Sequence, residues 1–110
     1  MFDLIISNLH IIGDGSVEVG IEGENGSIKS TEMEISGFPI AYKLESCQFV
    51  DIQRNQINLP IPLNETQLIR AVLANNCKTL LIRGNNVIFQ SQLDFEKIKS
   101  MRMVTFGKIH

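Results

Sequence analysis

Apolar and polar side chains alternate along most of this chain. Residues 2–12 are rich in isoleucine and leucine and end at a Gly-Asp-Gly stretch, after which residues 17–22 and residues 31–36 alternate. A period of two residues predicts β-strands with one buried face, and the glycine- and asparagine-containing stretches between them predict turns. Residues 40–52 predict one or two further short strands. We therefore expect the first half of the chain to fold as an antiparallel meander.

The pattern changes at the stretch LPIPLNETQLIRAVLANN. Its two prolines stop a strand, and Asn64 stands where a helix N-cap is wanted. Apolar residues then recur at helical spacing, which predicts the main helix over about residues 64–75. Asp94 is expected to cap a shorter helix that runs to Met101 near the C-terminus.

Two further elements complete the expected fold. The residues on either side of Gly84-Asn85-Asn86 predict a second hairpin, and residues 103–109 predict a closing strand. The sequence thus predicts an α+β fold. It consists of a twisted, mostly antiparallel sheet with the main helix packed on one face and a shorter C-terminal helix.

The first hairpin has one register that keeps its core face apolar. A three-residue loop over residues 25–27 pairs Val17 with Ile35 and Val19 with Met33. A two-residue loop would place charged side chains among the apolar ones, so we expect the longer loop.

The same register gathers four glutamates on the opposite face. It sets Glu18 opposite Glu34, places Glu32 opposite a glycine, and leaves Glu22 one step further along. Like charges directly opposite one another destabilise a sheet by about 0.2–1 kcal/mol per pair. Three interpretations stay open: a solvated face that keeps an edge soluble, a surface that meets a basic partner, and a cation site.

Length and composition predict one small globular domain over residues 1–110, because 44% of the side chains are hydrophobic and 20% are charged. The apolar start lacks a basic leader and is interrupted by polar residues, so we expect neither a signal peptide nor a membrane span, and a cytoplasmic protein. Cys47 and Cys77 lack neighbours at metal-ligand spacing and are expected to be reduced, buried thiols.

Charge is unevenly distributed along the chain. Residues 1–51 hold nine acidic and two basic side chains, whereas residues 52–110 hold three acidic and eight basic ones. The basic residues between 97 and 108 could contact phosphates, but few aromatic side chains accompany them and the whole chain is acidic. We therefore do not expect a nucleic-acid partner.

Residues suited to catalysis are scarce. His10 and His110 are the only histidines, so a histidine-based triad or proton relay is not expected. The glycine-containing turns are too short for a phosphate loop, and the carboxylates lack the spacing of a calcium loop. We expect no catalytic residues, no metal ligands and no cofactor.

Two resemblances bear on function. The run FDLIISNLHIIGDGSVEVGIEGENGSIKS looks like the first strands of metal-dependent amidohydrolases, but it lacks their His-x-His pair. The resemblance leaves a small hydrolase, or an accessory fragment of one, as the alternative function.

The general make-up of the chain is similar to that of bacterial immunity proteins, which neutralise toxins. That resemblance implies a non-catalytic binding module that holds a basic toxin, such as a nuclease, through Glu18, Glu22, Glu32 and Glu34. The sequence does not define the oligomeric state.

Overall fold

The computed structural model describes residues 3–62, 66–89 and 101–106, and every regular element in these ranges is a β-strand. The strands are β1 (Leu4–Ser7), β2 (His10–Ile12), β3 (Val19–Glu24), β4 (Ser27–Thr31), β5 (Glu34–Ser36), β6 (Ile40–Glu45), β7 (Phe49–Gln53), β8 (Gln56–Leu59), β9 (Ile69–Asn75), β10 (Thr79–Arg83), β11 (Asn86–Phe89) and β12 (Met101–Phe106). The described part of the chain contains no helix that could cross a membrane.

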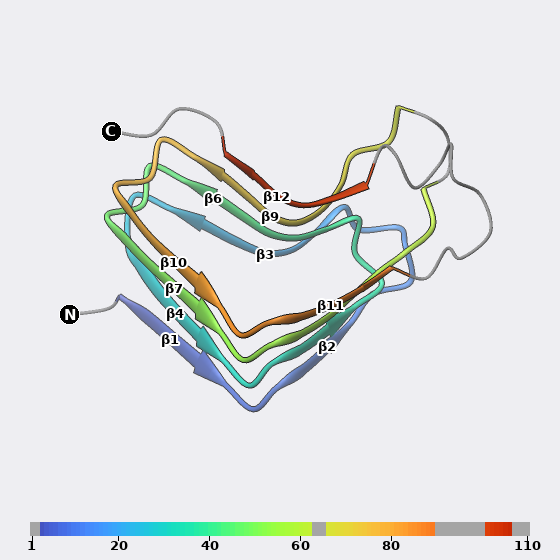
Figure 1. Cartoon of the computed structure of the whole chain (residues 1–110), viewed down its shortest axis with the longest axis horizontal. Helices are drawn as coiled ribbons and strands as arrows, with labels where there is room; N and C mark the ends of the chain where they lie inside the picture. The colour runs from blue at the N-terminus through green and yellow to red at the C-terminus, as the bar shows by residue number, and fades with distance from the viewer. Residues whose placement is uncertain (1–2, 63–65, 90–100, 107–110) are drawn as a thin grey trace.

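The strands wind into a parallel β-helix. Each set of three consecutive strands forms one rung and contributes one strand to each of three parallel sheets, ordered β1-β4-β7-β10, β2-β5-β8-β11 and β3-β6-β9-β12. Figure 1 shows the rungs stacked in sequence order, with a sharp bend between the first and second strand of every rung. We number the rungs 1 to 4, so that rung 1 comprises β1–β3 and rung 4 comprises β10–β12.

The strand registers show that an equivalent nine-residue segment recurs at the bend of each rung. The stretches LIISNLHII, IKSTEMEIS, VDIQRNQIN and LLIRGNNVI lie directly on one another, starting at Leu4, Ile28, Val50 and Leu80. The fifth residue of each stretch has a positive φ: Asn8, Glu32, Arg54 and Gly84. A single left-handed residue turns the chain sharply without breaking the flanking strands, so the repeat makes one corner of the β-helix.

A second corner follows the third strand of each of rungs 1 to 3. Asn25, Ser46 and Asn76 also have positive φ values there. The residues after Ser46 and Asn76 are Cys47 and Cys77, which therefore occupy equivalent positions on adjacent rungs, and both are buried free thiols. The expected reduced, buried cysteines are thus present in the structure.

The interior is mainly apolar, although Arg70 of β9 is buried, as are polar side chains near the first corner. Its largest fully buried side chains include Tyr42, Met33, Ile35, Leu44, Ile52, Ile57 and Leu59. Asn55 is also buried, and its Nδ2 donates to the Ser30 carbonyl (3.1 Å) and to Asn85 Oδ1 (2.9 Å), while its Oδ1 accepts the Met33 N–H (2.9 Å). The amide therefore ties three successive rungs together and satisfies backbone groups that the corner would leave unpaired.

One close backbone approach fixes the path from the second to the third sheet. Gly37 has a φ of +84°, and a Cβ at this position would overlap the backbone carbonyl of Gly13 on the preceding rung. Gly15 also has a positive φ, but a Cβ there would meet open space. Only glycine meets both requirements at residue 37.

The predicted α+β class and antiparallel sheet are wrong, because all strand pairs are parallel and the described residues contain no helix. The predicted helix over residues 64–75 is instead strand β9 from Ile69 onward, hydrogen-bonded between β6 and β12. A helix there would leave the backbone N–H and C=O groups of both neighbouring strands unpaired. The cost of losing these hydrogen bonds outweighs the local preference for a helix. The start of this prediction, residues 64 and 65, lies outside the described residues, and so do residues 94–100 of the shorter C-terminal helix. Its last residue, Met101, begins strand β12.

The predicted hairpins are also wrong. Val19 pairs with Ile40, and Glu34 pairs with His10, so no register joins residues 17–19 to residues 33–35. Gly84 forms a corner, not a hairpin loop. A two-residue bend with one left-handed residue redirects the chain into a second parallel sheet, whereas a hairpin needs both strands to return along each other.

Candidate protein-binding site

The four glutamates predicted to bind a partner lie on two different rungs. Glu18 directly precedes β3, and Glu22 lies on β3 in register with Lys43. Glu32 stands at the first corner of rung 2, with its Oε1 3.8 Å from Nε of Arg54. Glu34 lies on β5, with its Oε2 3.4 Å from Nδ1 of His10. The structure therefore separates Glu18 and Glu22 from Glu32 and Glu34.

Glu18 and Glu22 belong to a larger acidic group on rung 1. Residues 1–28 contain five carboxylate side chains and neither lysine nor arginine. The five are Asp3, Asp14, Glu18, Glu22 and Glu24. We call the outer edge of rung 1, residues 3–24, the acidic end. Charge of one sign concentrated at one end of a small protein attracts basic partners over roughly 10 Å at moderate salt.

Two aspartates of the acidic end are held by local hydrogen bonds. Asp14 Oδ1 accepts both the Oγ–H (2.5 Å) and the N–H (2.9 Å) of Ser16, and these bonds lower the pKa of the Asp14 carboxyl. Asp3 Oδ2 accepts the Ser27 N–H at 2.8 Å. These bonds fix the positions of the two carboxylate side chains.

Apolar side chains are exposed on the same rung. The exposed fractions are 44% for Leu4, 62% for Ile5, 52% for Leu9, 76% for Ile12 and 55% for Val17. In the described part of the chain, β1, β2 and β3 also each form the edge of their sheet. The acidic end thus combines carboxylates, exposed apolar groups and three unpaired strand edges, a combination typical of surfaces that other chains cover.

Two hollows open beside the acidic end. One, of about 410 Å³, is lined by Glu18, Pro39 and residues 66–68 among others. The other, of about 120 Å³, lies at the second corner and is lined by Asp3, Glu24 and their neighbours. Each hollow has a carboxylate at its wall, so a lysine or arginine side chain of a partner would find both space and a counter-charge there.

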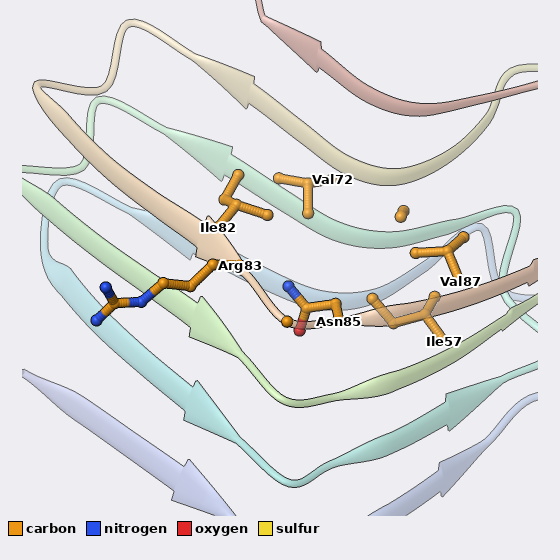
Figure 2. Close-up of a pocket in the computed structure, with 8 residues that line it drawn as sticks. Ile57, Val72, Ile82, Arg83, Asn85 and Val87 are labelled. Carbon is orange, nitrogen blue, oxygen red and sulfur yellow. The ribbon is translucent and has the colours of Figure 1, made fainter.

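A third hollow lies in the interior near rung 4. It measures about 110 Å³ and is walled mainly by Ile57, Val72, Ile82 and Val87. Figure 2 shows these apolar side chains around the space and the Arg83 side chain pointing away from it. An apolar hollow of this size without convergent polar groups offers no catalytic chemistry.

The described residues do not assemble a metal or catalytic centre. No three histidine, cysteine, aspartate or glutamate side chains within them could share a metal ion. His10 is exposed beside Glu34, and His110 lies outside the described residues. Burial, reinforced by the neighbouring Cys77 thiol, raises the pKa of Cys47, which makes this thiol a poor nucleophile.

Sequence reasoning found Glu18 and Glu22 but missed the exposed apolar residues of rung 1. The richness of residues 2–12 in isoleucine and leucine predicted a strand, but it did not show that Ile5 and Ile12 face outward on rung 1, where they are exposed. The nine-residue repeat at the first corner was the signal that could have revealed the stacking. Comparisons with protein-family models, with curated proteins and with solved structures give no match for this chain.

Proposed function

We propose that this protein is a non-catalytic binding module that holds a basic protein surface against its acidic end. The observation that carries the proposal is the coincidence, on rung 1 alone, of five carboxylates, five exposed apolar side chains and three strand edges. Carboxylates speed encounter and orient the partner, whereas apolar burial supplies most of the affinity. The strand edges can pair with an extended segment of the partner.

The four predicted contact residues differ in their expected contributions. Glu18 and Glu22 lie on rung 1, and Glu18 lines the larger hollow. Glu32 and Glu34 lie on rung 2, where each faces a basic side chain of this chain. Glu22 is itself in register with Lys43 of rung 2, so we expect Glu18 to contribute most to partner binding. A basic toxin domain, the partner that the resemblance to immunity proteins implies, is the concrete candidate outside this chain itself.

A pull-down with charge-reversal variants tests the proposal. The tagged chain is incubated with lysate of the source cells at low and at high salt, and retained proteins are identified by mass spectrometry. A basic protein retained near one-to-one, less strongly at high salt, and lost from the folded Glu18→Lys/Glu22→Lys variant supports the proposal. Glu45→Lys, an exposed glutamate on rung 2, is the matched control and should retain the partner. Equal retention by wild type and the double variant contradicts it.

A further inference from the structure

The two ends of the β-helix carry opposite charge. The strands of rung 4 contain Arg83 and Arg102 and no acidic residue, and Lys78 directly precedes them. In the described residues, β10, β11 and β12 form the other edges of the three sheets. We call this edge the basic end. The same molecule therefore carries a basic surface whose charge is complementary to that of the acidic end.

One outward-facing column in each of the first two sheets is apolar at both ends and polar in the middle, whereas the other outward columns, which end at Ser7 and Arg83 and at His10 and Asn86, are polar throughout. Ile5, Lys29, Asp51 and Leu81 lie in register across the first sheet, on the face opposite to the core residues next to them in the chain. The charged pair occupies the two inner rungs, and the apolar residues occupy the two outer ones. Contact with solvent alone does not explain why a column with polar residues in the middle has apolar residues at both ends.

The second sheet repeats this arrangement. Ile12, Ser36, Asn58 and Ile88 lie in register, with the polar residues inside and the isoleucines at the ends. Ile12 is 76% exposed and Ile88 is 42% exposed. Both sheets thus leave an apolar side chain on each end, where a further rung would cover it.

Placing rung 1 of one copy on rung 4 of another continues every column. Ile5 then follows Leu81, and Ile12 follows Ile88. The backbone of Asp3 bonds to Ser27, which shares a register column with Thr79, so Asp3 of the added copy would lie beside Thr79 and Lys78.

The third sheet would add a second contact between opposite charges. Val19 shares a column with Arg102, so Glu18 of the added copy would lie next to the position of Arg102. The facing strands also match in length, with 6 residues in both β3 and β12.

We propose that the partner of the acidic end is the basic end of a second copy of this chain, so that copies stack head to tail with parallel strands in continued register. This inference rests on the proposed function, since it names the partner for the same site. The interface is heterologous: it joins two different surfaces and leaves one free end of each kind, so that further copies can add to form a linear oligomer.

End-blocked variants test the stacking directly. Ile12→Lys places a charge on the acidic end, and Ile88→Lys places one on the basic end; both residues are exposed, so the fold should survive, as far-UV circular dichroism will verify. Sedimentation velocity should show wild-type mass rising with concentration and falling at high salt. Each variant alone should sediment as a monomer, because it retains only one kind of end.

An equimolar mixture of the two variants gives the decisive result. The free basic end of Ile12→Lys and the free acidic end of Ile88→Lys should pair, so that the mixture reaches the mass of two chains and no more. If Ile88→Lys alone still dimerises, or if the mixture stays monomeric, head-to-tail stacking is overturned. A monomeric wild type that still captures a different basic protein through Glu18 and Glu22 overturns this inference and leaves the proposed function standing.

Discussion

Replacing Asn55 with alanine should destabilise the β-helix more than any loss of an exposed polar group. The Asn55 amide is 2% exposed and accepts the Met33 N–H while it donates to the Ser30 carbonyl. Alanine leaves both of these backbone groups without that partner at a site closed to water. A buried group that loses its partner costs about 1–3 kcal/mol, so the two together should lower the free energy of unfolding by about 2–6 kcal/mol.

Equilibrium unfolding in urea, followed by circular dichroism, measures this loss. With a urea m-value of about 2 kcal/mol/M for a chain of this size, the unfolding midpoint of Asn55→Ala should fall by roughly 1–3 M. Asn86→Ala is the matched control, because Asn86 is exposed and only its backbone N–H, which alanine keeps, bonds to the Asn55 carbonyl. Its midpoint should change little.

Similar midpoints for Asn55→Ala and Asn86→Ala would refute the reasoning, because the buried amide would then contribute no more than a solvated one. A fall in m for Asn55→Ala at an unchanged midpoint would also count against it. Such a result would indicate a change in the surface exposed on unfolding and not the loss of hydrogen bonds between rungs.

Three further predictions follow from the same structure. In urea titrations, Gly37→Ala should lower the free energy of unfolding by at least about 3 kcal/mol and Gly15→Ala by only about 1–2 kcal/mol. Both variants strain a left-handed residue, but only Gly37→Ala also makes a Cβ overlap the backbone, so equal losses would contradict this prediction. Burial, partly opposed by a hydrogen bond to a serine, raises the pKa of Tyr42 from 10.0 to about 12, so the neutral phenol contributes about 3 kcal/mol to the free energy of unfolding below pH 10 and this contribution is lost as pH rises toward 12. Phenolate absorbance of this single tyrosine measures the pKa, and titration near pH 10 in the folded protein would contradict the prediction. Cys47 and Cys77 should react with a thiol reagent far more slowly in the native protein than in urea, because both are buried and the pKa of Cys47 is raised; equal rates would show that the second corner is open.

The local elements could be predicted from the sequence better than their arrangement. Residues 17–22 and 40–52 were expected as strands and contribute to β3, β6 and β7. Their partners were wrong, because alternation defines which side chains face inward and carries no information about which strand lies alongside. The stretch ending at Asn75 has helical spacing and was predicted as a helix, but pairing with β6 and β12 makes it strand β9.

The candidate site, like the fold, could be predicted only in part from the sequence. The charge asymmetry was visible in the sequence, and it identified Glu18 and Glu22 as part of an acidic surface. The grouping of these residues with Glu32 and Glu34 depended on a hairpin register that the chain does not adopt. The second corner at Asn25 ends rung 1 and carries the chain into rung 2, so it separates Glu18 and Glu22 from Glu32 and Glu34.

The sequence by itself determined that this chain consists mainly of strands, that its cysteines lack metal-ligand spacing, and that its first part is acidic. These properties follow from residue type and from spacing along the chain. Only the tertiary structure decided that the strands stack in parallel rungs, and with it which apolar residues, such as Ile5 and Ile12, lie on an open end. The reason is physical: strand pairing joins residues more than twenty positions apart, and whether a side chain is buried depends on the rung above it.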